Sequence, residues 1–563
     1  MRVLGVNAIF HDPSAALVVD GVTVAAAEEE RFSRRKHGKR PVPFSAWELP
    51  EQSIAFCLEQ AGLAASDLDA IAYSYDPALA RPVTGDLTED AWEGLRTLYA
   101  QRAPRFLATA LPGLDPDQVV HVGHHVAHAA SACMAAPHAS SAVLVVDGRG
   151  ERASHLAGHW TGDELRPLAC QRLPHSLGLL YEELTVHLGF HRSSDEYKVM
   201  AMASYGRPRF LEELREEVFA DGHGGFSAPP PDFSRYVAPL APGAEFTPDH
   251  ADLACSVQAV LEEVLLELAA WLHAETGEAA LTLAGGVALN CVANSRLFEE
   301  SPFEHVWAQP ASGDAGTALG AAMHVAHRLG DRVAPMPTAA LGRGFSDDQL
   351  RAALDVAAIP YEEPTDLPEA VAEVLAADGV VAWFQGRSEF GPRALGHRSL
   401  MADPRRRENL ERLNDVKGRE QFRPVAPMVL AERAAEVFEG GPLPSPHMLF
   451  VHRVKEAWRE RIQTVTHVDG TARVQTVDRE EEPLVHATIA AFERRTGVPV
   501  VVNTSLNTAG RPMVDDPRDA LECFGSSPVD LLVLGPYLVR RAALGRRDDG
   551  AQRFSRALTE VAA

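Results

Sequence analysis

Several features common in secreted, membrane-spanning and nucleic-acid-binding proteins are scarce in this 563-residue chain. Its six cysteines are scattered without a CxxC pair, which argues against a disulfide scaffold or a zinc ribbon and favours a reducing compartment. No run of 18 apolar residues occurs, and the opening stretch MRVLGVNAIF lacks the pattern of a cleaved signal peptide. We therefore expect a soluble, cytoplasmic protein that does not associate with membranes.

Positive charge is also in short supply. The 53 lysines and arginines are outnumbered by 78 acidic residues, and the formal net charge is -25. Phosphate contacts dominate the affinity of nucleic-acid-binding proteins, so this balance disfavours a nucleic-acid partner. The acidity favours a cationic small molecule or serves only to keep the protein soluble. The chain also lacks the G-x-x-x-x-G-K-[ST] motif, which excludes a P-loop enzyme.

The chain is too long for a single core, so we expect two or three domains. Two segments, starting at Val3 and Ala142, place apolar β-branched residues around an Asp-Gly pair, which predicts strand, turn and strand. A third predicted strand, 279–290, ends in Gly-Gly before a helical stretch. Such duplicated units indicate the α/β fold shared by sugar kinases, actin and heat-shock ATPases. Periodicity predicts a helix over 252–276, and the Pro- and Gly-rich segment 332–348 is a candidate linker.

A group of histidines in GHHVAHAASACMAA (123–136) is a candidate metal site. His124 and His128 are four residues apart, so on a helix they share one face and could bind one ion. His121 with His125 is the alternative pair. Two histidines without a further ligand need not bind metal, so carboxylates from elsewhere are required.

Two aspartates could complete this site. Asp147 in VVDGRGE and Asp314 in ASGDAGTALG follow predicted strands or begin Gly-rich turns, where side chains converge in α/β folds. A mixed set of imidazole and carboxylate ligands suits Fe(II), Mn(II) or Zn(II) without selecting among them. The Gly-rich turns AGGVALN and SGDAGTALG also lead into helices, where backbone amides can bind phosphate.

Basic residues are concentrated on turn-forming sequence in the C-terminal half. They are Arg387, Arg393, Arg398, Lys417, Arg419 and Arg423, with glycines and prolines between them. A solvated basic face normally lies on an amphipathic helix, whereas guanidinium groups on turns suit bidentate binding of a phosphate or carboxy-phosphate. We favour the anion site. Later segments add the polar candidates His467, Asp469, Arg473, Asn503, Ser505 and Asn507.

A last candidate pair follows the first predicted strand. His11 is suited to act as a general base on a hydroxyl group. Asp12 either binds a cationic substrate or caps the N-terminus of a helix. The charged segment 28–39 is either a solvated helix face or part of a ligand-binding loop.

Together these segments resemble the NodU/CmcH family of O-carbamoyltransferases, including the actinobacterial enzymes that carbamoylate antibiotics. The resemblance covers nearly the whole chain. It rests on GVNAIFHDPSAALVVDG, AEEERFSRRKHG, GHHVAHAASA, VVDGRGE, YKVMAMASYG, LAGGVALNCVANS, GDAGTALGAA, WFQGRSEFGPRALGHRSLMADPR, FRPVAP and VVNTSLN, in that order. So many ordered motifs are specific to the family, although they identify no single member.

The resemblance implies two domains. Residues 1–340 would form a TsaD-like domain of the actin-like ATPase (ASKHA) type, and residues 341–563 a YrdC-like α/β domain. It also implies two reactions. Carbamoyl phosphate and ATP, the latter with Mg²⁺, would give carbamoyladenylate and pyrophosphate in the C-terminal domain. In the N-terminal domain a substrate hydroxyl would then attack the carbamoyl carbon, and AMP would leave.

The family's residue roles can be assigned to positions of this chain. His124, His128, Asp147 and Asp314 would hold Fe(II), or another divalent metal, as a Lewis acid. His11 would deprotonate the acceptor hydroxyl, and Asp12 would lie beside the acceptor. Lys417 and Arg423 would be catalytic in the second domain. The nucleotide and carbamoyl phosphate would contact Gly285, Gly286, Asn290, Arg387, Arg393, Arg398, His467, Arg473, Asn503 and Ser505.

The expected partner is a small-molecule hydroxyl acceptor, such as a cationic or glycosylated antibiotic. A tRNA carbamoylating or threonylcarbamoylating enzyme is one alternative, disfavoured by the net charge. A non-catalytic, chaperone-like nucleotide-binding module is another, although it leaves the C-terminal basic residues without a role.

Overall fold

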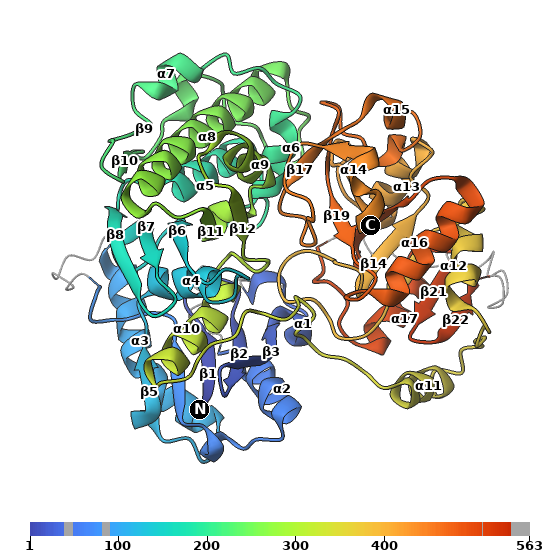
Figure 1. Cartoon of the computed structure of the whole chain (residues 1–563), viewed down its shortest axis with the longest axis horizontal. Helices are drawn as coiled ribbons and strands as arrows, with labels where there is room; N and C mark the ends of the chain where they lie inside the picture. The colour runs from blue at the N-terminus through green and yellow to red at the C-terminus, as the bar shows by residue number, and fades with distance from the viewer. Residues whose placement is uncertain (39–48, 81–89, 509, 542–563) are drawn as a thin grey trace, which may run out of the picture.

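The computed structural model describes residues 1–38, 49–80, 90–508 and 510–541. The chain forms an N-terminal domain with two five-stranded sheets and a C-terminal domain beside it (Figure 1). Residues 329–346, between the last helix of the first domain and α11, form neither helix nor strand, in agreement with the predicted linker. The expected boundary at residues 340 and 341 lies within this segment.

The first sheet has the strand order β3-β2-β1-β4-β5. Its strands are β1 (Arg2–Asn7), β2 (Ser14–Val19), β3 (Val22–Glu28), β4 (Ala70–Tyr73) and β5 (Val119–His121). The first three are antiparallel, whereas β4 and β5 run parallel to β1. Asp20 and Gly21 join β2 to β3 with φ of 49° and 77°, the positive values that a tight hairpin turn requires and that Asp-Gly supplies.

The second sheet repeats this arrangement, with the order β12-β11-β6-β7-β8. Its strands are β6 (Ser141–Val146), β7 (Ala153–Trp160), β8 (Leu165–Arg172), β11 (Ala280–Ala284) and β12 (His305–Ala308). Again the first three are antiparallel and the last two run parallel to the first. The predicted duplication is therefore confirmed, and with it the α/β class and the actin-like organisation of this domain.

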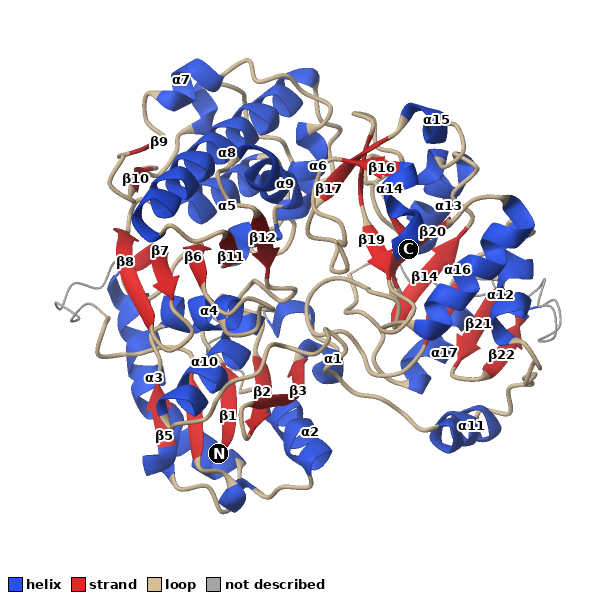
Figure 2. Ribbon diagram, in the orientation of Figure 1, coloured by secondary structure: helices blue, strands red, loops and turns tan. Residues whose placement is uncertain are grey.

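Two alanine-rich helices lie between the sheets, α4 (His124–Cys133) and α10 (Ala315–Arg328) (Figure 2). They meet backbone to backbone: a Cβ added at Gly320 on α10 would stand 1.8 Å from the Ala127 carbonyl oxygen on α4. Likewise, a Cβ on Gly5 of β1 would stand 1.8 Å from the Ala318 carbonyl oxygen. Only glycine fits such approaches, so these positions set the spacing of the helices.

The remaining helices of this domain pack around the two sheets and against one another. They are α1 (Glu30–Ser33), α2 (Glu51–Ala61), α3 (Asp90–Ala110), α5 (Leu177–His187), α6 (Glu196–Ala203), α7 (Leu211–Arg215), α8 (Pro248–Thr276) and α9 (Cys291–Glu300), with the short strands β9 (Phe219–Ala220) and β10 (Phe226–Ser227). The helix predicted over 252–276 is confirmed within α8.

The C-terminal domain is built on a mixed seven-stranded sheet of order β19-β15-β20-β14-β13-β21-β22. The strands are β13 (Val381–Phe384), β14 (Arg398–Ala402), β15 (Ala426–Leu430), β19 (Gln475–Val477), β20 (Val500–Ser505), β21 (Leu531–Leu534) and β22 (Tyr537–Arg540), with β16 (Phe438–Glu439), β17 (Val451–Val454) and β18 (Thr471–Arg473) in a smaller sheet. The helices are α11 (Asp347–Val356), α12 (Leu367–Ala376), α13 (Glu408–Lys417), α14 (Ala434–Val437), α15 (Glu456–Arg459), α16 (Pro483–Thr496) and α17 (Pro517–Ser526). This confirms an α/β domain; its YrdC-like character stays a prediction.

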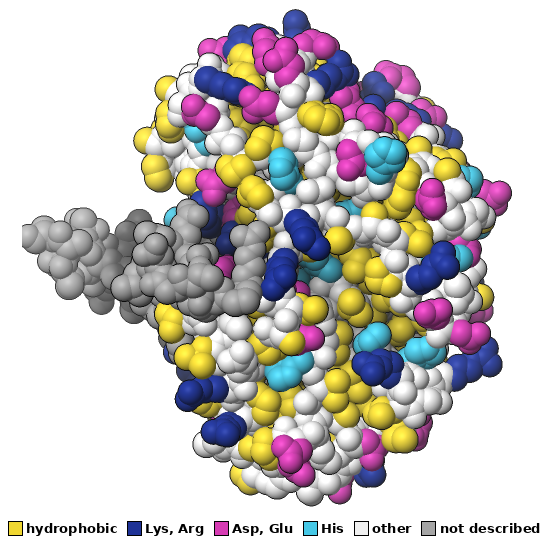
Figure 3. Space-filling view, turned by 90° about the vertical axis from the view of Figure 1, so that its left-hand side faces the viewer, with side chains coloured by type: hydrophobic (Ala, Val, Ile, Leu, Met, Phe, Trp, Pro, Cys, Tyr) yellow, Lys and Arg dark blue, Asp and Glu magenta, His cyan; other side chains and the backbone are white. Residues whose placement is uncertain are grey.

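Buried polar contacts join the two domains. The Gly391 amide donates to Glu28 Oε1 at 2.7 Å, and Arg31 Nη2 donates to the Gly391 carbonyl at 2.8 Å. Among the described residues, no helix is both long and apolar enough to cross a membrane. On the described part of the face in Figure 3, lysines and arginines are dispersed among acidic and apolar side chains.

We predict that Gly320→Ala destabilises the protein by about 1–3 kcal/mol, because the new methyl group would overlap the Ala127 carbonyl. Urea unfolding followed by circular dichroism measures the change. Gly525→Ala is the matched control: this glycine lies in α17 with no atom within 4 Å of the added Cβ, so stability should stay constant or rise. Equal effects of the two substitutions would contradict the prediction.

Candidate active site

A single cavity of about 2310 Å³ extends between the two domains. Its lining includes Asp147 and Asp314 from the N-terminal domain and Lys417, Arg423 and Arg473 from the C-terminal domain. Residues predicted for the two halves of a reaction therefore face one continuous cavity.

His124, His128, Asp147 and Asp314 form a compact group at the N-terminal end of this cavity, in which the two aspartates line the cavity and the histidines lie behind them. One potential ligand atom from each of the four residues lies within 4.8 Å of the other three. His124 Nε2 is 3.5 Å from Asp147 Oδ2 and 3.6 Å from Asp314 Oδ1, and His128 Nε2 is 3.6 Å from that Asp314 oxygen. All four residues are buried.

Each of these four side chains is positioned by its element. His124 and His128 are one turn apart at the start of α4; Asp147 directly follows β6, and Asp314 directly precedes α10. The His124 ring is oriented through Nδ1, which lies 3.2 Å from the Ser74 carbonyl, so that Nε2 faces the carboxylates. The Gly286 amide donates to Asp147 Oδ1 at 3.0 Å. Such outer hydrogen bonds are typical of metal ligands.

Several donor atoms of this group lack a hydrogen-bond partner, as expected of atoms that bind a metal ion. Among the described residues, His124 Nε2, His128 Nε2 and Asp314 Oδ2 are buried without a hydrogen-bond partner. Burial opposes the charge on Asp147, but the imidazoles of His124 and His125 outweigh it and hold the pKa of the carboxyl well below its usual range. Two buried carboxylates facing imidazole nitrogens fit a divalent cation, which would satisfy both charge and coordination.

The geometry also separates the two histidine pairs. His121 lies on β5, and its Nε2 is 3.1 Å from the Ala100 carbonyl, away from the aspartates. His125 Nε2 is 3.6 Å from Asp147 Oδ2, so His125 contacts a potential ligand from outside the four-residue group.

A second histidine–aspartate arrangement adjoins this group. His11 Nδ1 is 2.9 Å from Asp12 Oδ2, and His37 Nδ1 is 2.7 Å from Asp12 Oδ1. The other ring nitrogen of His11, Nε2, is 3.5 Å from Asp314 Oδ2. Burial opposes the charge of Asp12, but His37 and His11 keep its pKa well below the usual range.

Asp12 begins no helix: β2 follows at Ser14, so the alternative that Asp12 caps a helix is wrong. Its φ of 49° is a strained value for a non-glycine residue and aims the carboxylate at the two imidazoles. Sequence reasoning missed His37, whose only signal was its place in the charged segment 28–39. Lys39 of that segment lies outside the described residues.

The backbone of the predicted nucleotide turn contacts Asp147 of the His/Asp group. A Cβ on Gly285 would stand 2.2 Å from the Val146 carbonyl oxygen, so glycine lets the turn approach β6. Asn290 caps α9 by accepting from the Ala293 amide at 3.1 Å, and its Nδ2 donates to Gln258 at 2.9 Å. The Asn290 side chain is thus committed within the protein.

The opposite end of the cavity is strongly cationic. It is lined by Arg393, Lys417, Arg419, Arg423 and Arg473. Burial and then the charge of Arg473 lower the pKa of Arg393 to about 9, and burial with Arg423 does the same to Arg419. Burial, followed by Arg419 and Arg423, lowers the pKa of Lys417 well below its usual value.

These cations have few compensating charges. In the part of the chain that the structure describes, Arg423 pairs with Glu420 at 3.3 Å, whereas Arg393, Lys417, Arg419 and Arg473 have no carboxylate oxygen within 4 Å. Buried like charges without counterions are costly, so the cluster fits an anionic ligand with several oxygens.

Polar residues complete the cationic end. Lys417 Nζ donates to Ser505 Oγ at 3.0 Å. Asn503 Nδ2 donates to the Ala394 carbonyl and to Gln475, which leaves its Oδ1 buried without a partner in the described structure. His467 also lines the cavity, where burial lowers its pKa to about 4 and keeps the ring neutral.

Two arginines predicted to bind anions are engaged elsewhere, which corrects the sequence-based expectation for them. Arg398 is fully buried, and its guanidinium donates to the carbonyls of Gln385 (2.7 Å) and Arg343 (2.9 Å). Arg387 donates to the carbonyls of Gly342 (2.9 Å) and Val24 (3.1 Å). Both therefore satisfy backbone oxygens at or near the domain junction.

Two family models match the chain. Residues 2–227 and 234–323 match the carbamoyltransferase N-terminus, and residues 372–541 match the carbamoyltransferase C-terminus. Nodulation protein NolNO of Sinorhizobium fredii is 39% identical over 96% of this chain and 81% of that protein. Nodulation protein U of Rhizobium tropici is 30% identical and covers 93% of each chain. The crystal structure of T. kodakarensis HypF covers 59% of this chain and 48% of that chain, at 15% identity and a TM-score of 0.32.

We predict that His128→Ala lowers the affinity for a divalent metal more than about tenfold, because one of four converging ligands is removed. Metal content after incubation with Fe(II) without oxygen, or with Zn(II), measures this without reference to activity. His121→Ala should retain the metal, since His121 faces Ala100. Metal retained by His128→Ala, or lost from His121→Ala, would place the ion elsewhere.

Proposed function

The chain belongs to the carbamoyltransferase family, and from this membership we propose that it is an ATP-dependent O-carbamoyltransferase acting on a hydroxyl of a small-molecule natural product, as in antibiotic biosynthesis. The observation that carries the proposal is the single cavity with a buried His/Asp group at one end and, at the other, a cationic group in which only Arg423 pairs with a carboxylate in the described structure. Carbamoyl phosphate and ATP are anions that suit the cationic end.

In the proposed first reaction, carbamoyl phosphate loses its phosphate to water. An oxygen of the resulting carbamate then attacks the α-phosphorus of ATP, pyrophosphate leaves, and carbamoyladenylate forms. Arg393, Arg423 and Arg473 would bind the phosphate oxygens, and preorganised guanidinium groups stabilise the charge that develops on them. Lys417 and Ser505 would hold the carbamoyl end.

In the proposed second reaction, an acceptor hydroxyl attacks the carbamoyl carbon, and the bond from that carbon to the AMP oxygen breaks. Asp12 accepts from His11 Nδ1, which makes Nε2 the basic nitrogen that takes the hydroxyl proton. His37 fixes Asp12 in turn, so Asp12 orients the base rather than contacting the acceptor directly. Fe(II), or another divalent ion, held by His124, His128, Asp147 and Asp314 would supply a Lewis acid beside this base.

The continuity of the two ends in one cavity suits the proposed intermediate. Carbamoyladenylate is a mixed anhydride that water would hydrolyse, and a shared cavity would let it pass between the domains without release from the protein.

We predict that the two half-reactions can be separated by mutation. His11→Ala should lower transfer by about 10²–10⁴-fold while pyrophosphate release continues, because only the second step needs this base. Arg423→Ala should stop pyrophosphate release while transfer from supplied carbamoyladenylate persists. Pyrophosphate and product assays on the full chain measure both. Loss of both steps in His11→Ala would mean that His11 is structural.

We also predict equal yields of inorganic phosphate and pyrophosphate, since carbamoyladenylate retains only the phosphate of AMP. Incubating the protein with carbamoyl phosphate, ATP and Mg²⁺ and quantifying both products tests this, with a protein-free sample to correct for spontaneous decay of carbamoyl phosphate. Pyrophosphate without matching phosphate would contradict the scheme.

The acceptor is tested by adding hydroxyl-bearing natural products, cationic and neutral, and detecting the mass of one added carbamoyl group. A tRNA sample in the same panel addresses the macromolecular alternative. Carbamoylation of tRNA but of no small molecule would overturn the proposed acceptor class.

A further inference from the structure

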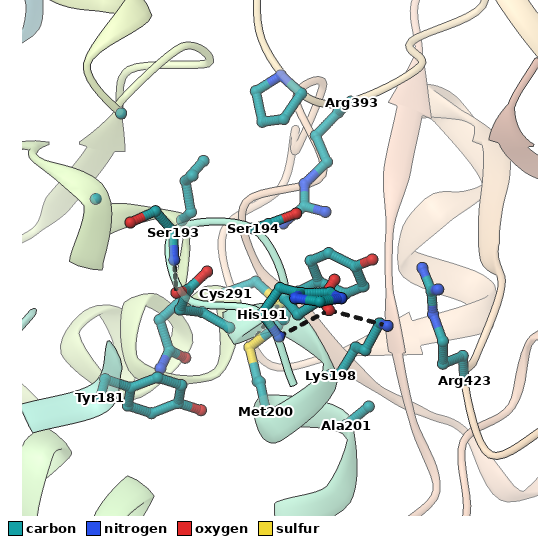
Figure 4. A pocket seen from close by; sticks show the side chains of 18 of the residues that line it. Tyr181, His191, Ser193, Ser194, Lys198, Met200, Ala201, Cys291, Arg393 and Arg423 are labelled. Atoms are coloured by element: carbon teal, nitrogen blue, oxygen red, sulfur yellow. Dashed lines mark hydrogen bonds and ion pairs between the residues drawn. The ribbon is translucent and has the colours of Figure 1, made fainter. Parts of the chain in front are cut away.

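A helix of the N-terminal domain contacts the cationic site of the C-terminal domain. Tyr197 and Lys198 lie in the first turn of α6, and the segment 419–424 that carries Arg423 lies against them. Figure 4 shows Lys198 and Arg423 reaching from the two domains into the same part of the cavity, with Arg393 nearby. This contact joins residues more than 200 positions apart.

Two interactions from α6 reach Arg423. The guanidinium carbon of Arg423 is 4.6 Å from the centre of the Tyr197 ring, a cation–π geometry. Lys198 Nζ is 2.8 Å from Glu420 Oε1, and the other carboxylate oxygen of Glu420 is 3.3 Å from Arg423 Nη1. Lys198 is also 3.2 Å from Asp195, which fixes the base of this chain of contacts.

Aromatic packing holds the same segment in place. Phe422, next to Arg423, packs against Phe246 at 5.3 Å between ring centres and against Phe190 at 6.4 Å. The Tyr205 hydroxyl donates to the Phe422 carbonyl at 3.4 Å. The segment is thus docked on the N-terminal domain through its side chains and its backbone.

Arg423 needs such support because its neighbours repel it. Arg393, Arg419 and Arg473 share the cavity end with it, and Glu420 is its single carboxylate partner within 4 Å in the described structure. Without the Tyr197 ring and the paired Glu420, the lowest-energy position of this long side chain would be farther from the other cations. The electron-rich face of the Tyr197 ring attracts the Arg423 guanidinium but carries no net charge, so the site stays positive for an anionic ligand.

We infer that Tyr197 and Lys198 are positioning residues for the carbamoyl-phosphate end of the C-terminal site, so that adenylate formation in one domain depends on a helix of the other. This inference rests on the proposed function. Tyr197 acts through its ring on Arg423, and Lys198 acts through Glu420.

The test is steady-state pyrophosphate release by the full chain at varied carbamoyl phosphate and saturating ATP. Tyr197→Leu should raise the KM for carbamoyl phosphate about 3- to 10-fold, the loss expected from one partly desolvated cation–π contact. Tyr197→Phe, which keeps the ring face, should behave as the wild type. Transfer from supplied carbamoyladenylate should be unchanged in both variants, which a general structural defect would not allow.

Tyr236→Leu is a matched control. It removes another tyrosine of the N-terminal domain that is stacked on an arginine, in this case on Arg235 of its own domain. The guanidinium carbon of Arg235 lies 4.8 Å from the centre of the Tyr236 ring. Neither residue is among the described residues that line the cavity. An equal rise in KM in this control, or an unchanged KM in Tyr197→Leu, would overturn the inference. Loss of both half-reactions in Tyr197→Leu would overturn it as well.

A second pair of variants keeps the test decisive if Tyr197→Leu folds poorly. Lys198→Met and Glu420→Gln each break the ion pair; each should raise the same KM, and the double variant should be no worse than the more affected single variant. Additive effects would mean that the two residues act independently, against the inference. A wild-type protein that releases no pyrophosphate overturns the proposed function itself, whereas normal release with unaffected variants overturns only this inference.

Discussion

The backbone contact between α4 and α10 is the constraint on which the candidate site depends. Gly320 lets α10 meet the Ala127 carbonyl of α4 without an intervening side chain. Because Asp314 precedes α10 and the two histidines begin α4, this spacing brings His128 Nε2 to 3.6 Å from Asp314 Oδ1. The duplicated sheets pack on both sides of the helix pair and hold it in place. The His/Asp group is therefore a consequence of how the two halves of the N-terminal domain pack together.

The cavity separates charge in a way that suits two successive reactions. Buried carboxylates dominate one end, where His124 and His128 face them, and buried guanidinium groups dominate the other. Protein groups balance each end only in part, through the imidazoles at one end and Glu420 at the other, so one end fits a cation and the other a polyanion. A net charge of -25 is therefore compatible with a local cationic site. Most acidic residues lie away from the cavity end that contains Arg393 and Arg473.

The junction between the two domains joins them and also contributes residues to the candidate site. Arg387 satisfies backbone carbonyls across it, whereas Arg423 is stacked on Tyr197 and supported by Glu420 and Lys198. The same residue type thus joins the domains in one position and lines the cavity in another. The proposed intermediate would cross between the domains, which would require their relative position to be well defined, and buried contacts of this kind define it.

Residue spacing in the sequence was enough to predict which side chains share a face of one helix and where a strand turns back on itself. Residues four apart on a helix share a face, so His124 and His128 could be paired from sequence, and the repeated strand-turn-strand units predicted the duplicated sheets. Only the tertiary structure decided the partners of residues that meet across long separations. Arg393 and Arg398 occupy the same turn-rich segment, yet Arg393 faces the cavity while Arg398 is bound to carbonyls. Lys198 meets Glu420 across 222 positions. Residue spacing predicts the contacts within one helix or hairpin, because the backbone geometry of that element imposes them. The contacts of Arg398 and of Lys198 with Glu420 depend instead on which surfaces of the folded chain are buried against each other.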